Sequence, residues 1–260
     1  MKTLSLSLFL YTLIAFGTSF ANPPSLPNPL PSEKGGIVLT FDDRNFDDWL
    51  AALPLFEQYK IKATFFISGP VDQKALDAAL ELKKHGHAIG CHSIRHLAAV
   101  KYAAQFSAEQ YVQKEVLPQL TAFKAAGIHP TAFAYPMSNN NESTDAALLK
   151  IFRHVRTGAG ISSGERISDK KVFFVPVSNI GKHHILIGKG VDYAPTKILT
   201  FQQIDDALTR AAKNKEIIVL YAHRIASSGK GHRISPTALK HIFNSAKKLQ
   251  LPFYTVDQLP

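Results

Sequence analysis

The segment IVLTFDD, residues 37–43, is a short apolar run that ends in two adjacent carboxylates, Asp42 and Asp43. A run of this length is typical of a buried strand. An Asp pair directly after a strand is more often a turn or a helix cap than a catalytic pair. The segment alone therefore predicts a strand. Whether Asp42 and Asp43 are functional depends on the residues at the ends of the other strands.

Short apolar runs alternate with longer helical stretches along the rest of the chain. Asp72, Ser107 and Ser235 are capping residues that predict the starts of three helices. Pro118 is expected to kink or divide the second helix. The expected strands cover residues 37–41, 63–67, 87–90, 131–134, 172–175, 217–221 and 253–255. This alternation predicts an α/β fold with a mostly parallel sheet, open or closed into a barrel, although residues 157–190 show no clear pattern.

The composition is that of a globular protein, because 45% of the 260 residues are hydrophobic and 19% are charged. A chain of this length can bury a core without disulfides or structural metals, and one domain, or at most two, is expected. The formal net charge of +10 suggests an anionic partner. The basic residues are scattered and form no run with interleaved aromatic residues, which favours a solvated basic surface over a nucleic-acid module.

The N-terminus has the pattern of a secretory signal peptide. Met1 and Lys2 precede an apolar stretch over residues 4–16, and a small-x-small site ends at Ala21. We expect cleavage near Ala21 and export to the periplasm or the medium. No later apolar stretch reaches the ~20 residues that span a bilayer, so no transmembrane segment is expected. Residues 22–35 contain five prolines and predict an extended linker, which leaves 36–260 as the folded domain.

Polar side chains collect where several expected strands end. His92 and His96 follow one strand, and His223 follows another. Functional residues gather at the carboxyl ends of strands in α/β sheets and barrels. Each histidine alone is a weak signal, because eleven histidines in this chain give roughly half a His-x-x-x-His pair by chance. The convergence of carboxylates and imidazoles at several strand ends is what indicates a site.

Two histidines four residues apart can share a metal ion, and one carboxylate would complete a three-ligand site. Such a site is catalytic in type, because structural zinc sites use four protein ligands. The open fourth position of such a site holds a water molecule.

Five segments together resemble the ordered motifs of the polysaccharide deacetylases, carbohydrate esterase family 4. They are TFDD (40–43), KATFF (62–66), GHAIGCHSIRH (86–96), FAYP (133–136) and IVLYAH (218–223). The resemblance covers roughly residues 36–260. It implies a catalytic domain with an irregular (β/α) barrel of about seven strands.

The resemblance also implies a role for each matching residue. Asp42 would be the general base and His223 the general acid. The backbone N–H of Met137 would hold the oxyanion, next to Tyr135 and Pro136 in the substrate site. One zinc ion or another divalent metal per chain would be bound by Asp43, His92 and His96.

The chain departs from the family pattern in three places and therefore resembles a divergent branch. Arg44 stands where most members have Gly, Ala134 stands where many carry an Arg that orients the base, and the Asp-x-x-x-Asp-Trp motif is absent. We expect Arg156 to replace the missing Arg as a catalytic residue, because a nearby cation would keep the base ionised and fix its rotamer. A surface Arg on a loop is the alternative.

The leading interpretation is an exported, metal-dependent deacetylase. It would hydrolyse N-acetyl groups on N-acetylglucosamine-type units of a cell-wall or extracellular polysaccharide, and release acetate and a free amine. One alternative is a non-catalytic glycan-binding protein on the same fold, which would require neither Asp42 nor His223. Another is a hydrolase of a different C–N bond.

Overall fold

The computed structural model describes residues 34–193 and 199–260. The expected signal peptide and all but the last two residues of the expected linker lie outside the described residues. Among the helices of the described part, none is long and apolar enough to cross a membrane.

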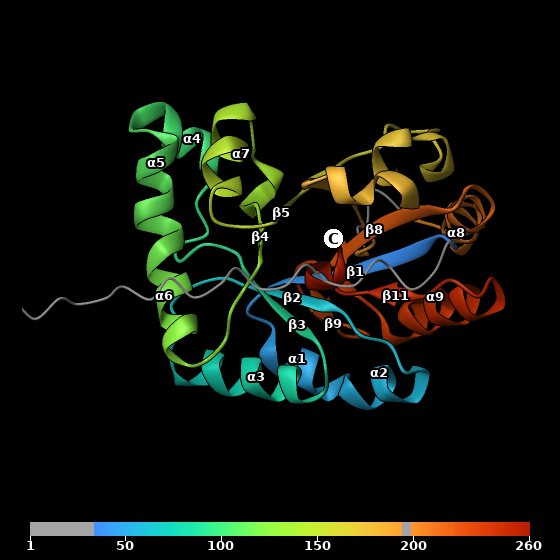
Figure 1. Cartoon of the computed structure of the whole chain (residues 1–260). Coiled ribbons are helices and arrows are strands. Elements are labelled where there is room, and N and C mark those ends of the chain that lie inside the picture. Colours follow the sequence, from blue (N-terminus) through green and yellow to red (C-terminus); the bar gives the residue numbers. More distant parts are fainter. Residues whose placement is uncertain (1–33, 194–198) are drawn as a thin grey trace, which may run out of the picture.

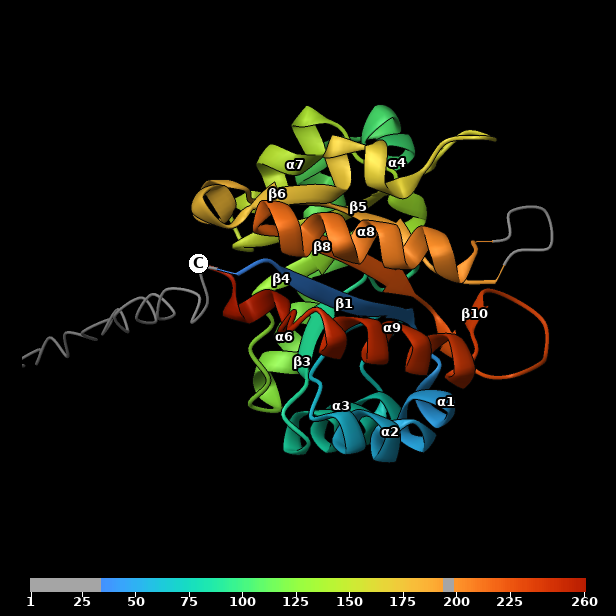
Figure 2. The same ribbon diagram turned by 90° about the vertical axis from the view of Figure 1, so that its right-hand side faces the viewer.

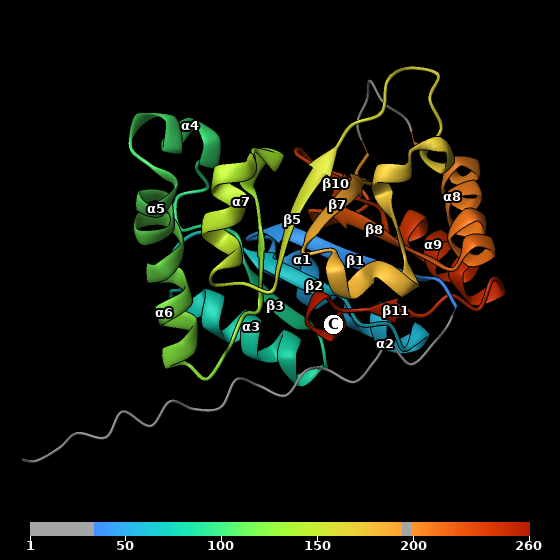
Figure 3. The same ribbon diagram turned by 45° about the horizontal axis from the view of Figure 1, so that its top comes forward.

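Seven parallel strands close into a barrel, which confirms the predicted fold class (Figure 3). Their order around the barrel is their order in the chain, and pairing of the first strand with the last closes the ring. The barrel strands are β1 (Gly36–Asp43), β2 (Thr64–Ile67), β3 (Ala88–Cys91), β4 (Ala132–Ala134), β5 (His154–Ala159), β7 (Ile185–Gly190) and β8 (Glu216–Ala222).

Three further elements extend this sheet or lie near its end. β11 (Phe253–Tyr254) pairs in parallel with the first residues of β1. The later residues of the same edge of β1 pair with β2. β6 (Phe174–Pro176) is antiparallel to β8. A separate parallel ribbon of β9 (Arg224–Ile225) and β10 (Arg233–Ile234) follows β8. β1 thus has partners along both edges.

Helices cover the outside of the barrel, with α5 and α6 on one side and α8 and α9 on the other (Figure 1). α8 and α9 lie side by side (Figure 2), and His241 bonds to Asp205 between them at 2.9 Å. The helices are α1 (Phe46–Ala51), α2 (Leu53–Tyr59), α3 (Gln73–Lys84), α4 (Ala99–Gln105), α5 (Ala108–Tyr111), α6 (Leu117–Ala125), α7 (Glu142–Leu149), α8 (Phe201–Asn214) and α9 (Pro236–Lys248).

The predicted helix starts are confirmed by their caps. The side chains of Asp72, Ser107 and Ser235 each accept a hydrogen bond from the backbone N–H three residues later. The division expected at Pro118 is also found, because α5 passes into a π-helical turn, Val112–Val116, and α6 begins at Leu117. Proline fits in the first turn of α6, where its missing N–H costs no helical bond.

The strand expected at 172–175 is wrong as a barrel strand. Lys171–Phe173 forms a 3₁₀ turn, and β6 pairs antiparallel as an edge strand that ends in Pro176. An edge tolerates proline because its N–H is not needed by a neighbour. The barrel strand of this region is β7, whose sequence ILIGKG has too many glycines to stand out as an apolar run.

Small residues inside the barrel make room for larger ones. Asp42, Phe66 and Gly90 are in register on three adjacent strands. A Cβ atom on Gly90 would lie 2.2 Å from Cδ1 of Phe66. Since Phe66 is fully buried, its ring cannot swing into solvent to make space.

We predict that Gly90→Ala destabilises the protein by about 1–3 kcal/mol, because the added methyl group overpacks the barrel. Urea unfolding followed by circular dichroism measures the change. Gly160→Ala is the matched control, since no atom outside residues 159–161 lies within 4 Å of the position that its added methyl group would take, and it should change stability by less than about 0.5 kcal/mol. Equal stability of Gly90→Ala and the parent would contradict this account of the packing.

Candidate active site

The carboxyl ends of the barrel strands surround a pocket of about 370 Å³. Eight of the nine site residues predicted from the sequence line it, and Pro136 is buried without lining it. The eight are Asp42, Asp43, His92, His96, Tyr135, Met137, Arg156 and His223. The structure therefore brings together residues that lie up to 181 positions apart in the chain.

Asp43, His92 and His96 form a group whose potential ligand atoms all lie within 4.8 Å of one another. Oδ1 of Asp43 is 3.6 Å from Nε2 of His92 and 3.3 Å from Nε2 of His96. Nδ1 of His92 lies 2.8 Å from the carbonyl oxygen of Ala134, which leaves Nε2 to face Asp43. This donor set, two imidazoles and a carboxylate, fits a divalent metal such as zinc.

The charge state of Asp43 also suits a metal ligand. Burial raises the pKa of Asp43, but its interactions with His92 and His96 outweigh burial and hold the pKa well below its usual range. The carboxylate is therefore ionised at neutral pH, as a ligand to a cation must be.

Two side chains on the neighbouring helix hold the loop that carries both histidines. Gln119 accepts a hydrogen bond from the backbone N–H of His92 at 3.1 Å and donates to the carbonyl of Ile67 at 2.9 Å. Glu115 is completely buried and accepts from the backbone N–H of Arg95 at 3.0 Å and from its Nε at 2.5 Å. Glu115 belongs to the π-helical turn, and such turns are frequent at functional sites.

The backbone around the pocket is strained. Among the described residues, eight other than glycine have a positive φ, and five of these lie at the site. The five are Asp43 (85°), Ser93 (64°), His96 (55°), Met137 (55°) and Ser138 (53°). Such conformations cost about 1–3 kcal/mol each and persist where the surrounding structure enforces them, commonly at functional sites.

Arg156 donates a hydrogen bond from Nη2 to Oδ2 of Asp42, inside the barrel. The structure thus places Arg156 where its predicted role requires, and it pairs in register with Ala134 on the adjacent strand. Among the described residues nothing donates to Oδ1 of Asp42, which is buried. One carboxylate oxygen is therefore fixed by the guanidinium, and the other has the lone pairs that a general base needs.

Two aromatic rings lie against the guanidinium of Arg156. Its carbon is 4.7 Å from the ring centroid of Tyr221 and 5.5 Å from that of Phe66. The Tyr221 ring fits there because Gly188 and Gly190 lack side chains, since a Cβ atom on either would lie 3.0 Å from it. These contacts hold the cation while keeping water from it.

His223 is held on three sides. Its Nδ1 is 2.6 Å from Oδ2 of Asp192, and its backbone N–H donates to Oδ1 of the same carboxylate at 3.0 Å. Its carbonyl oxygen accepts from Nε1 of the buried Trp49 at 2.8 Å. Burial lowers the pKa of His223, but Asp192 and the charges of Asp42 and Asp43 outweigh it, so the pKa is raised above its usual value.

Asp192 lines the pocket and bonds to His223, and sequence reasoning missed it. It follows β7, so it stands at a strand end like the other site residues. The signal was hidden because the glycines of β7 obscured the strand. The contact of Trp49 with His223 was not predicted either.

The remaining predicted residues take different positions. Tyr135 borders the pocket but is buried, and its hydroxyl donates to Asp145 at 2.7 Å. Met137 is 63% exposed at the pocket. Arg44 donates to the carbonyls of Ser68 and Pro70 at 3.0 and 2.6 Å and so ties the loop after β1 to the loop after β2.

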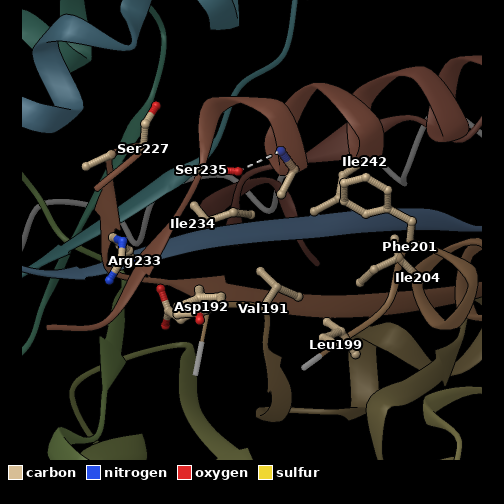
Figure 4. A pocket seen from close by; sticks show the side chains of 13 residues that line it. Val191, Asp192, Leu199, Phe201, Ile204, Ser227, Arg233, Ile234, Ser235 and Ile242 are labelled. Atoms are coloured by element: carbon tan, nitrogen blue, oxygen red, sulfur yellow. Dashed lines mark hydrogen bonds between the residues drawn. The ribbon is translucent and has the colours of Figure 1, made fainter. Parts of the chain in front are cut away.

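A second pocket, of about 360 Å³, lies beside the first and shares Asp192 and Leu199 with it. Apolar side chains such as Val191, Ile234 and Ile242 line most of it (Figure 4). Asp192 therefore forms part of the border between a polar site and an apolar one.

The fold and the site define a (β/α)-barrel protein with a carboxylate–imidazole centre that suits a divalent metal. Comparison with known families agrees, because residues 30–151 match the polysaccharide deacetylase family model. This match covers a little under half of the chain and agrees with the resemblance of its motifs.

Two peptidoglycan-N-acetylglucosamine deacetylases of Bacillus cereus are similar in sequence. One is 30% identical over 115 residues, which are 44% of this chain and 52% of that protein. The other is 28% identical over 102 residues, 38% of this chain and 37% of that protein. The chain thus spans about half the length, or less, of these curated relatives.

Solved structures show the same fold. A Streptococcus mutans carbohydrate esterase of family 4 matches with a TM-score of 0.57 at 20% identity, covering 85% of this chain and 86% of the other. The catalytic domain of a peptidoglycan N-acetylglucosamine deacetylase from Eubacterium rectale matches with a TM-score of 0.53 at 19% identity, covering 87% and 90%.

We predict that Asp192→Asn lowers the pKa of His223, because the substitution removes the negative charge that favours the imidazolium and replaces one carboxylate oxygen by an NH2 group. Proton NMR titration of the metal-free protein measures the shift. The signal of His87 is an internal control, because burial lowers the pKa of His87 to about 4 and it does not contact Asp192. An unchanged His223 titration would contradict the assigned pairing.

The same shift affects stability in a defined pH range. Because the pKa of His223 is raised on folding, the pair with Asp192 stabilises the protein fully below the unfolded value of about 6.5. This contribution is lost as the pH rises through the pKa of the folded state. The stability difference between parent and Asp192→Asn should therefore shrink at alkaline pH.

Proposed function

We propose that this protein is an exported, metal-dependent deacetylase that hydrolyses N-acetyl groups of a polysaccharide. The observation that carries the proposal is that one pocket holds three kinds of group. They are a set of potential metal ligands, the carboxylate of Asp42 paired with Arg156, and His223 paired with Asp192. The similarity to peptidoglycan-N-acetylglucosamine deacetylases favours N-acetylglucosamine units as the substrate. The N-terminal sequence pattern supports export to the periplasm or the medium.

A divalent ion held by Asp43, His92 and His96, zinc being well suited, would polarise the amide carbonyl and make water a better nucleophile. In the reaction, Asp42 accepts the proton of the attacking water. The hydrogen bond from Arg156 holds that carboxylate in one orientation. The backbone N–H of Met137 donates to the oxygen that becomes negative when water adds to the carbonyl carbon.

His223 completes the reaction as the general acid. Cleavage of the C–N bond requires a proton on the leaving nitrogen, and an imidazolium can supply it. The raised pKa of His223 keeps the ring protonated to higher pH than an ordinary histidine. The products are acetate and a free amine on the sugar. A protein that only bound glycans would need neither this pair nor Asp42.

Acetate release tests the proposal. The purified protein is incubated with peptidoglycan, chitin oligomers and an N-acetylated exopolysaccharide, with and without a chelator. We expect acetate from at least one glycan, loss of activity with chelator and recovery when zinc is added. Glycan binding without acetate release would favour the binding protein, and release from a non-glycan amide alone would favour another C–N hydrolase.

We predict that Asp42→Asn and His223→Ala each reduce turnover by about 10²- to 10⁴-fold while the metal ion held by Asp43, His92 and His96 is retained, because each removes a proton transfer. His92→Ala should instead lose the metal ion of that site. Thermal unfolding of Asp42→Asn is measured alongside, since this change leaves Arg156 buried without its partner. Full activity in either proton-transfer variant would refute its role, and metal loss in Asp42→Asn would show that the two carboxylates are exchanged.

A further inference from the structure

The pocket contains a second group of potential metal ligands that the proposed reaction does not use as such. Asp192, His223 and His232 offer one carboxylate oxygen and two imidazole nitrogens, all within 4.8 Å of one another. The ring centroids of His223 and His232 are 5.0 Å apart, with 32° between the planes. This is the same donor set as that of Asp43, His92 and His96.

The backbone holds His232 at this position. It directly precedes β10, and its carbonyl oxygen accepts from the backbone N–H of Arg224 on β9 at 3.3 Å. The carbonyl of Arg233, the next residue, accepts from the N–H of Tyr193 at 2.7 Å. The His232 side chain itself is exposed, so an ion from solvent can reach it. Asp192 is fixed by its two bonds with His223.

We infer that Asp192, His223 and His232 form a second divalent-metal site, whose occupation inhibits the enzyme. Two imidazoles and a carboxylate are sufficient ligands for zinc with an open position. The second site is expected to be weaker than the first for two reasons. An ion has to displace the proton shared between His223 and Asp192, and it has to order the exposed His232 ring.

The inhibitory effect rests on the proposed role of His223. An imidazolium carries protons on both ring nitrogens, whereas a ring bound to a metal through one nitrogen carries at most one. A ring that is a metal ligand therefore cannot donate as an imidazolium to the leaving amine. Low metal concentrations should activate the enzyme through the first site, and higher ones should inhibit it through the second.

Metal counting tests the site without relying on activity. The protein is stripped with chelator, zinc is added in steps, and bound metal is measured by equilibrium dialysis and calorimetry. We expect two equivalents in the parent, the second weaker, and one in His232→Ala and in His232→Asn. His129→Ala is the matched control, because His129 is also exposed but lies before β4, at the opposite ends of the strands. It should keep both equivalents.

Acetate release is measured across the same zinc series, with each variant compared to its own maximum rate. The zinc concentration for half inhibition should rise at least about tenfold in His232→Ala and remain unchanged in His129→Ala. One equivalent in the parent, or a second equivalent that survives in both His232 variants, would overturn the site. A second equivalent that leaves the rate unchanged would overturn its inhibitory effect. Failure to release acetate from any glycan would refute the proposed function, while the metal count would still decide the site.

Discussion

The pairing of β1 with β8 closes the barrel, and the site depends on this closure. Six residue pairs join the two strands, from Gly36 with Ile217 to Phe41 with Ala222. Asp42 and Asp43 continue β1 beyond the last pair, and His223 follows directly on β8. The proposed base, one metal ligand and the proposed acid thus stand on adjacent parallel strands, and short local segments are enough to bring them together.

The barrel interior also has to accommodate a buried ion pair. Taking Arg156 and Asp42 out of water costs several kcal/mol per ion, and only close pairing offsets that cost. The guanidinium lies against the rings of Phe66 and Tyr221, which occupy space that glycines of neighbouring strands leave open. A larger residue at these glycine positions would clash with one of the two rings.

Much of the fold could be predicted because local signals and tertiary structure agree. Helix caps such as Asp72 and apolar strand runs depend on neighbouring residues alone, and strand ends such as His92 are predictable from them. The position of Arg156 was predictable from charge. Ala134 stands where many family members carry the Arg that orients the base, so another cation was expected beside Asp42. Asp192 was not, because the glycines of β7 that fit the Tyr221 ring also remove the apolar pattern of the strand. These glycines are explained by their contact with Tyr221 on another strand, and a pattern within β7 alone does not reveal such a contact.

Of the strands in the described residues, β1 is synthesised first and is the last to gain all of its partners. Its partners on β8 and β11 come roughly 180 to 215 residues later in the chain. Until those segments have been synthesised and have paired with it, β1 has an open, apolar edge, and such edges pair readily with wrong partners. Long-range pairings of this kind also slow folding. Because β1 carries both Asp42 and Asp43, the site can form only when the last strands have paired with β1 and closed the barrel.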